Sequence, residues 1–376
     1  MKMAFATTFD GNDVRNWSGT PFYMSHAFQQ RGFTIDYLGN FKRELPFGFK
    51  AKQIFKKIMC DQRESPRFNI VTAKNYSKQL EEKLKSSSAD IILAPQIHPI
   101  CYLETNKPLI LWTDALYASL IGFYPGFSSH SASSIAQGNT ITRECLNRCS
   151  LAIFSSDWAA RTAIEIYGVD KNKIKVVPFG ANIDHAPTLD ETCEFIRARS
   201  KSKIKLLFLG KHWDRKGGQV VFDVTKALDQ AGHDVELNFV GCHPPADIEI
   251  PSYIHVHGFI SKRTPEGIEK IKKLLRESHF LFVPSRAEAY GIVFCEANAY
   301  GLPCLTTHVG GISTIVKDNV NGMTFALDAS PESYCEFIVN AMKRYEEFAI
   351  TSFHEFEKRL NWKVATESVK KMIAQV

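Results

Sequence analysis

The stretch HFLFVPSRAEAYGIVFCEANAYGLPCLTT, residues 279–307, contains the pattern that decides the fold. Its first part, HFLFVPS, is an apolar run of strand length that leads into a polar loop. The chain then turns at Gly291 into a short apolar helix, after which LPCLTT forms a second apolar run. Strands of this kind, separated by helices, indicate a mostly parallel sheet that is covered on both faces.

The same alternation extends over the second half of the chain. IKLLFLG, residues 204–210, predicts a strand, and the segment after Lys216 predicts a helix that ends near Gly232. Further strands are expected in DVELNFVG, YIHVHGFI and GMTFAL, with helices at 265–278, at 292–300 and after Pro331. This pattern predicts a doubly wound α/β domain over residues 200–355.

The first half repeats the pattern from its first strand, KMAFATTF. Thr20 can cap a helix that has Pro21 at its first position and stops at Gly32, and the preceding loop brings Ser18 and Gly19 to the top of the sheet. Later strands are expected in TIDYLG, ADIILAP, PLILWTD, LAIFSS and KIKVVPFG, with helices at 141–148 and 157–167. The sequence therefore predicts a second Rossmann-like domain over residues 1–188, with the polar segment 181–203 as the linker.

The composition is that of an ordinary globular protein: of 376 residues, 44% are hydrophobic and 23% are charged. No run reaches the roughly 20 apolar residues of a membrane span. The N-terminus, MKMAFATTFDGND, does not have the pattern of a secretion signal, so a cytoplasmic location is expected. Nine cysteines without a CxxC pair favour neither disulfides nor zinc, and Cys145 and Cys149 are interpreted as small packed side chains.

Basic residues cluster between Lys42 and Arg67, where eight basic and three acidic residues give a net charge of +5 within an overall charge of +6. Aromatic and aliphatic side chains, among them Phe47, Phe55 and Ile58, are interleaved with them. Segment 41–67 could therefore contact an anionic membrane surface at the inner face of the membrane, or an anionic acceptor. An ordinary solvated loop and helix face is an equally good interpretation.

Two carboxylates lie within residues 279–307. Glu288 lies in the loop after the strand, and Glu296 lies eight residues later in the apolar helix. A buried carboxylate is costly unless a group donates to it, and the two hydroxyls of a ribose are suitable donors. The backbone N–H groups of Gly291, Ile292 and Val293 at the helix start could hold a phosphate. The alternative is that both carboxylates form structural caps or ion pairs.

A second candidate is the loop FLGKHWDRKGG, residues 208–218, in which Lys211, Arg215 and Lys216 follow a strand and precede a glycine pair. Lysine side chains here could reach a diphosphate and stabilise the charge that develops on a departing phosphate. The loop does not have the spacing of a nucleotide-triphosphate P-loop. A solvated basic loop is the ordinary alternative.

Together these segments resemble retaining transferases of glycosyltransferase family 4, which have the GT-B fold. The resemblance covers nearly the whole second half, and WSGTPFYMSHAFQQRG, WTDALYA, SSDWAA and PFGAN extend it into the first, as in a bacterial branch of the family. It implies two Rossmann-like domains that face a central cleft. The final LNW and the helix after it resemble the family's C-terminal helix, so residues 356–376 are expected to pack on the first domain.

The resemblance also implies a role for each matching residue. Glu288 would contact the donor sugar and Glu296 the ribose, while Lys211 and Lys216 would bind the diphosphate. The segment from Tyr290 through Gly291 and Ile292 to Val293 would supply backbone N–H groups to the diphosphate, and Gly19 would approach it from the first domain.

Two positions depart from the family pattern. Lys211 stands where relatives have arginine, so it keeps the charge but loses the bidentate geometry. Asp114 stands where many relatives have a histidine near the reacting centre. Its side chain is expected either to accept a hydrogen bond from the acceptor hydroxyl or only to shape the pocket.

Metal binding is not expected. His98 and His130 are interpreted as structural or solvent-facing, and His255 and His257 share a strand face without an evident third ligand. The family resemblance implies no metal and no cofactor beyond the nucleotide-sugar donor. No nucleic acid partner is expected.

The sequence thus predicts a hexosyltransferase that moves a sugar from UDP- or GDP-sugar to an acceptor hydroxyl with retention, in glycolipid or surface polysaccharide synthesis. Glu288, Lys216 and Asp114 are its candidate catalytic residues. Three alternatives stay open: a nucleotide-sugar epimerase of the same fold, a phosphorylase-like enzyme with pyridoxal phosphate, and a non-enzymatic sugar-nucleotide-binding protein. The base, the sugar and the acceptor stay open as well.

Overall fold

The computed structural model describes all 376 residues, Met1–Val376, as two compact units. The first comprises Met1–Phe179 together with Trp362–Val376, and the second comprises Gly180–Asn361. The chain therefore passes between the units twice, and the second unit is inserted into the first. The sequence predicts the domains at 1–188 and 200–355, whereas the second unit of the structure already begins at Gly180 and continues to Asn361.

The first unit is built on six parallel strands in the order β2-β1-β3-β4-β5-β6. Their bounds are β1 Lys2–Ala6, β2 Thr34–Leu38, β3 Ile91–Ala94, β4 Leu109–Thr113, β5 Leu151–Phe154 and β6 Ile174–Val176. The strand order reverses between β1 and β3, which makes this pair the topological switch point of the sheet. The predicted Rossmann-like architecture is confirmed for this half.

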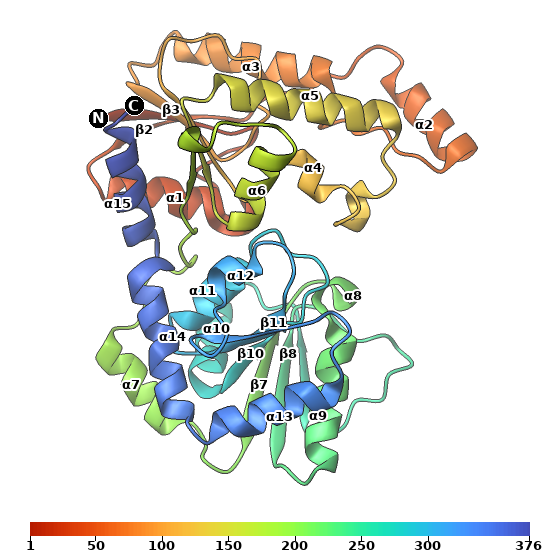
Figure 1. Cartoon of the computed structure of the whole chain (residues 1–376), viewed down its shortest axis with the longest axis vertical. Coiled ribbons are helices and arrows are strands. Elements are labelled where there is room, and N and C mark those ends of the chain that lie inside the picture. The colour runs from red at the N-terminus through yellow and green to blue at the C-terminus, as the bar shows by residue number, and fades with distance from the viewer. The chain divides into compact units, whose positions relative to one another are not determined.

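Helices cover both faces of this sheet (Figure 1). The helices of this unit, of which α2 extends beyond the sheet, are η1 Asn16–Gly19, α1 Thr20–Gln29, α2 Phe49–Cys60, α3 Ile70–Leu84, α4 Tyr117–Leu120, η2 Pro125–Phe127, α5 Ala132–Arg148, α6 Asp157–Glu165, η3 Lys171–Lys173 and α15 Trp362–Ile373. The N-cap of α1 is Gly19 rather than Thr20, which is already helical, and no side chain caps this helix. Helix α5 starts at Ala132, earlier than expected, because Ser131 caps it by accepting from the Ser134 N–H.

The core of the first unit follows from the alternation of side chains along the strands. Ala4, Ile92 and Leu111 point to the face that packs on α3 and α5. The opposite face carries Trp112, whose ring lies 6.1 Å from Phe28 of α1 and 5.7 Å from Trp362 of α15. The C-terminal helix is thus part of the core of the first unit, and it lies beside α1 in Figure 1.

The second unit also has six parallel strands, in the order β12-β11-β10-β7-β8-β9. Their bounds are β7 Ile204–Leu209, β8 Val235–Val240, β9 Ile254–Gly258, β10 Phe280–Phe282, β11 Cys304–Thr307 and β12 Gly322–Phe325. The helices are α7 Leu189–Ala198, α8 Trp213–Lys216, α9 Gly218–Gln230, α10 Pro265–Glu277, α11 Ile292–Asn298, α12 Ile312–Ile315, α13 Pro331–Met342 and α14 Tyr345–Arg359. The strand order reverses between β7 and β10, so the carboxyl ends of these two strands are where such a sheet binds its ligand.

The segment 181–203, which was expected to be a linker, contains helix α7, so this prediction is wrong for residues 189–198. Thr188 and Glu191 form a capping box at its start, in which each side chain bonds the other's backbone N–H. Beyond its end, the buried guanidinium of Arg199 donates to the carbonyls of Tyr300 and Gly301, each at 2.7 Å. The polar residues of this segment therefore cap α7 and attach it to the second unit, of which the segment is part.

The last segment forms two helices rather than the single one expected over 356–376. Helix α14 ends at Arg359, which donates to the carbonyls of Thr314 and Ile315 at 2.6 and 2.7 Å and so stays in the second unit. Helix α15 begins at Trp362, whose ring stacks on Phe179 at 5.6 Å in the first unit. The transfer from one unit to the other takes place at residues 361–362.

Candidate active site

The two loops that follow β7 and β10, at the switch point of the second unit, pack directly on each other. Gly217 has φ +73°, and a β-carbon at this position would lie 2.2 Å from the carbonyl oxygen of Pro284. The Arg286 N–H donates to the carbonyl of Arg215 at 2.8 Å. Only glycine fits at position 217. The close approach of the two loops places the side chain of Lys216 against the loop that follows β10.

Lys216 and Glu288 form an ion pair at this junction, with Lys216 Nζ donating to Glu288 Oε2. Arg215 Nη1 lies 3.5 Å from the same carboxylate oxygen and also donates to the carbonyl of Ala287 at 3.0 Å. The side chains of Lys216 and Glu288 are 10% and 14% exposed. Two cations and one carboxylate thus lie together in a largely desolvated position. A bound anion could replace the carboxylate as the acceptor of the hydrogen bonds from the two cations.

Helix α11 begins just beyond this carboxylate. Its N-cap, Gly291, has φ +96°, and a β-carbon there would lie 2.6 Å from the ring of Phe294. The first N–H groups of a helix have no partner within it, which applies here to the half-buried Ile292 and Val293. Tyr290, the residue before the cap, is buried, and its hydroxyl lies 3.5 Å from the Cys295 sulfur. Its side chain therefore faces the core, so only its backbone is available to a ligand.

Glu296 is buried in α11, as its apolar neighbours predict, and its partner is Lys262. Lys262 Nζ donates to Glu296 Oε2 at 2.6 Å, from a side chain that is half exposed. The lysine comes from the loop between β9 and α10. The buried carboxylate therefore has its charge offset by a cation that solvent can reach.

Lys211 takes a different position from Lys216. It is exposed, and its Nζ lies 5.0 Å from the ring centroid of Phe259. Phe259 belongs to the same β9–α10 loop that supplies Lys262. The structure thus brings Lys216 and Glu288 together, while Lys211 contacts the loop that reaches Glu296.

Gly19 and Asp114 lie in the first unit. Gly19 has φ +85° and follows two residues, Trp17 and Ser18, that also have positive φ, so the backbone turns sharply in front of α1. Asp114 directly follows β4 and is half-buried. Its charge partly offsets the desolvation that lowers the pKa of the Arg67 guanidinium. Both residues follow strands of the parallel sheet, Gly19 in the loop after β1.

The histidines keep the structural character that was expected of them. His98 is buried against the ring of Phe68 at 4.7 Å, and neither of its ring nitrogens has a hydrogen-bond partner. Burial, reinforced by the charges of Arg67 and Arg43, holds the pKa of His98 well below its usual value. His130 Nδ1 lies 2.8 Å from the Tyr117 hydroxyl.

Sequence reasoning did not identify two partners in this site. Arg215 was placed only in the basic loop, without its bond to Ala287 or its approach to Glu288. Lys262 was not connected with Glu296, because the two are far apart in sequence and only the fold brings them together. The loops that follow parallel strands lie at one edge of the sheet, where α11 also begins. A lysine in the loop after β9 could therefore have been predicted to approach Glu296.

Comparison with known proteins agrees with this geometry. Residues 203–344 match the family model described as "Glycosyl transferases group 1". A D-inositol 3-phosphate glycosyltransferase of Nocardia farcinica (strain IFM 10152) is 28% identical over 180 residues, which is 44% of this chain and 39% of that protein. The chain matches about half or less of the length of the curated relatives to which it is similar.

Solved structures extend the likeness of fold to the whole chain. WaaG, a glycosyltransferase involved in lipopolysaccharide biosynthesis, superposes with a TM-score of 0.62 at 18% identity, covering 99% of each chain. Anabaena HepE, determined in complex with UDP and glucose, gives 0.62 at 15% identity and covers 100% of each chain. At such identities the likeness establishes the GT-B fold and leaves the activity to be argued from the site.

Proposed function

On the premise that residues 203–344 form a group 1 glycosyl transferase domain, we propose that the protein transfers a sugar from a nucleotide-sugar donor to an acceptor hydroxyl. The observation that carries the proposal is the junction of Lys216, Arg215 and Glu288 at the switch point of the second sheet. A parallel sheet binds its ligand there, and the donor set matches a diphosphate that is joined to a sugar.

The donor diphosphate would lie against Lys216 and the start of α11. Lys216 would exchange part of its bond to Glu288 for a bond to phosphate oxygens, with Arg215 next to it. The N–H groups of Ile292 and Val293 would add neutral donors. Cations and N–H groups already in place stabilise the negative charge that builds up on the diphosphate as the glycosidic bond breaks.

The two carboxylates would orient the two ends of the donor. Glu288, freed in part from Lys216, would accept hydrogen bonds from hydroxyls of the donor sugar. Glu296 would accept from the ribose, and Lys262 would then share its charge with the ligand. Lys211 would approach the same end of the donor from its position beside Phe259.

We further propose a UDP- or GDP-sugar as donor, retention of configuration, and a glycan or glycolipid as acceptor. The complex of HepE with UDP and glucose and the role of WaaG in lipopolysaccharide biosynthesis support these choices by likeness of fold. Retention by a front-side path requires no protein nucleophile, because the departing diphosphate deprotonates the acceptor hydroxyl. The acceptor would bind in the first unit, where Asp114 follows β4 and Gly19 precedes α1, and no metal would be required.

The test begins with thermal shift against UDP-, GDP- and ADP-sugars at equal concentration, because the ligand that binds the native state most tightly raises the melting temperature most. The selected donor is then incubated with a panel of sugar and glycolipid acceptors, and the release of nucleoside diphosphate is measured. We expect release that depends on the acceptor and that Lys216→Ala or Glu288→Ala lowers by at least about 100-fold with the fold intact.

The same experiment separates the alternatives. An epimerase would convert the donor without any acceptor, which chromatography of the sugar nucleotide would reveal. A binding protein would show the thermal shift but release no diphosphate with any acceptor. A phosphorylase-like enzyme would show the absorbance of pyridoxal phosphate. Each of these results would remove the proposal of sugar transfer.

A further inference from the structure

Helix α2 of the first unit has its apolar side turned away from the protein. Phe49 is its only buried residue, while Ile54, Phe55, Ile58 and Met59 are exposed, Phe55 by 60% and Ile58 by 74%. Surface helices normally bury their apolar stripe against the core. In α2 the apolar side faces solvent instead, and specific contacts with the rest of the unit hold the helix in this orientation.

Polar contacts hold the opposite side of α2 on the protein. Lys52 Nζ lies 3.3 Å from the buried carboxylate of Glu64, and Gln53 Nε2 donates to the Glu64 carbonyl at 3.2 Å. Glu64 in turn accepts from Ser131 and Ser134 at the start of α5, at 2.8 and 3.1 Å. Phe49, Lys52, Gln53 and Lys56 recur at helical spacing and form the protein side, which leaves Ala51, Ile54, Phe55 and Ile58 as the outer side.

The charges on α2 identify what would cover its outer side. The helix carries Lys50, Lys52, Lys56 and Lys57 and no acidic residue. None of the helices in the structure combines the length and the apolar character of a membrane span. A short helix with an apolar outer side between lysines fits the interface of an anionic bilayer, where the side chains enter the acyl boundary and the lysines meet phosphates. A second copy of the same surface would instead bring lysines against lysines.

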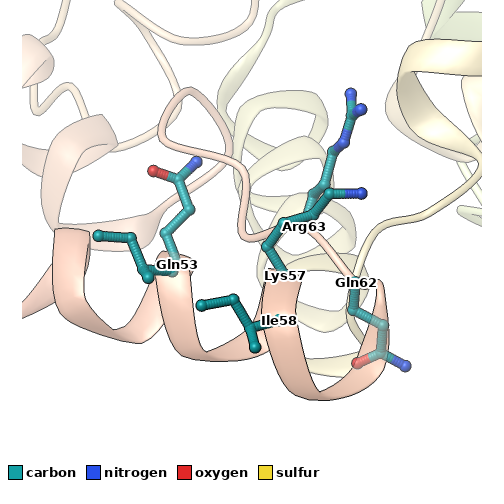
Figure 2. Close-up of a pocket in the computed structure, with 6 residues that line it drawn as sticks. Gln53, Lys57, Ile58, Gln62 and Arg63 are labelled. Carbon is teal, nitrogen blue, oxygen red and sulfur yellow. The ribbon is translucent and has the colours of Figure 1, made fainter.

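A hollow on the flank of the helix adds a more specific feature (Figure 2). It has a volume of about 470 Å³ and is lined by Gln53, Ile54, Lys57, Ile58, Gln62 and Arg63. Arg63 is fixed by its backbone, whose N–H donates to Ser129 at 2.7 Å and whose carbonyl accepts from Ser131 at 3.0 Å. The isoleucines supply an apolar wall. Lys57 Nζ donates to the exposed carboxylate of Asp61 just after the helix, so a lipid phosphate would replace this carboxylate on Lys57 and meet Arg63 next to it.

We propose that α2 docks in the plane of a bilayer that contains anionic phospholipid, with Phe55 and Ile58 in the acyl boundary and one lipid head group held between Lys57 and Arg63. This inference does not depend on the proposed sugar transfer, since a protein without that activity would bind the bilayer equally well. It assigns to the exposed surface of segment 41–67 a defined orientation and a defined ligand.

Cosedimentation of the full-length protein with phosphatidylcholine vesicles, with and without phosphatidylglycerol, tests the proposal. Binding is expected only when phosphatidylglycerol is present, and salt should weaken it. The double substitution Phe55→Ser with Ile58→Ser is expected to lower the partition coefficient by about 100-fold, roughly tenfold for each side chain withdrawn from the acyl boundary. The double substitution Lys50→Gln with Lys57→Gln, at two exposed lysines of the helix, is expected to lower it by about 25-fold at low salt.

Matched control variants lie on the same unit. Val71→Ser with Ile166→Ser removes exposed apolar side chains, and Lys78→Gln with Lys171→Gln removes exposed lysines, in both cases outside α2 and its hollow. The controls are expected to bind within about twofold of the wild type. All replaced side chains are at least partly exposed, so circular dichroism melts should be unchanged.

Three results would overturn the proposal. Equal binding to vesicles with and without phosphatidylglycerol would contradict the charge argument, and unchanged binding of the Phe55 and Ile58 variant would exclude the apolar side. Sedimentation equilibrium without lipid provides the third result. If the wild type is a dimer and the Phe55 and Ile58 variant is a monomer, a second copy of the chain, rather than a bilayer, covers α2.

Discussion

Replacing Lys216 by glutamine tests the central contact of the candidate site, and its effect on nucleotide binding can be worked out from the structure. A hydrogen bond to a charged group contributes about 1.5–3 kcal/mol, or roughly 12- to 150-fold in the dissociation constant. Lys216 already pairs with Glu288, so a diphosphate would replace one anionic partner by another. Arg215 would also remain 3.5 Å from the carboxylate. We therefore expect the lower part of the range, about 10- to 30-fold weaker binding of UDP or GDP, whichever the protein binds.

Glu288→Gln is expected to act in the opposite direction on the free nucleotide. Removing the carboxylate takes away the anion that competes for Lys216, so the nucleoside diphosphate should bind as tightly as before or several-fold more tightly. The sugar nucleotide should lose whatever affinity its sugar adds, because glutamine is a weaker acceptor for hydroxyl donors than a carboxylate. The two variants therefore separate the phosphate contact from the sugar contact.

Isothermal titration calorimetry at constant ionic strength, with the nucleoside diphosphate and with its sugar nucleotide, measures both effects. Lys273→Gln, on an exposed side chain of α10, is the matched control and should bind like the wild type. The reasoning is refuted if Lys216→Gln binds the diphosphate within twofold of the wild type. It is also refuted if Glu288→Gln weakens the diphosphate as much as the lysine variant does.

Three further predictions concern stability and are measured by urea unfolding. Gly217→Ala should lower the free energy of unfolding by about 2–4 kcal/mol, because the new methyl group meets the Pro284 carbonyl and the backbone has φ +73°; a loss below about 0.5 kcal/mol would contradict the packing of the two loops. Lys262→Met should cost about 1–2 kcal/mol at neutral pH, since the buried Glu296 loses its cation; no measurable loss would mean that this ion pair contributes nothing. The buried His279 has a pKa lowered from 6.5 to about 4, mainly by burial, so it stabilises the fold fully above pH 6.5 and loses that contribution as the pH falls toward 4. The free energy of unfolding should fall by about 3 kcal/mol more in the wild type than in His279→Gln between pH 7 and pH 4, and equal slopes for the two proteins would refute the shift.

The strands of both sheets could be predicted from sequence because strands buried on both faces are continuous apolar runs between turns. Helices whose buried face is narrow were harder to predict. Helix α7 was interpreted as linker although Thr188 and Glu191 form a capping box, and only two of its residues, Thr192 and Ile196, are buried. Helix α2 gave no inward apolar pattern at all, because its apolar side faces outward.

The candidate site was accessible from sequence only where one continuous segment encodes it. Gly291 and Glu296 belong to a single strand–loop–helix stretch, so their arrangement follows from local geometry. The pairing of Glu288 with Lys216 depends on the order of strands in the sheet, which places the ends of β7 and β10 next to each other. Lys262 comes from a third loop, and nothing local to its sequence identifies Glu296 as its partner.

The double passage of the chain between the units determines the order in which they can form during synthesis. Most of the first unit is synthesised first, but its last helix is missing until Trp362 and the residues after it have left the ribosome. Until then the aromatic surface around Trp112 and Phe179, which Trp362 later covers, stays open to water. The second unit is therefore the first whose residues have all been synthesised. Until α15 has been synthesised as well, the nascent first unit exposes an apolar surface that chaperones can bind.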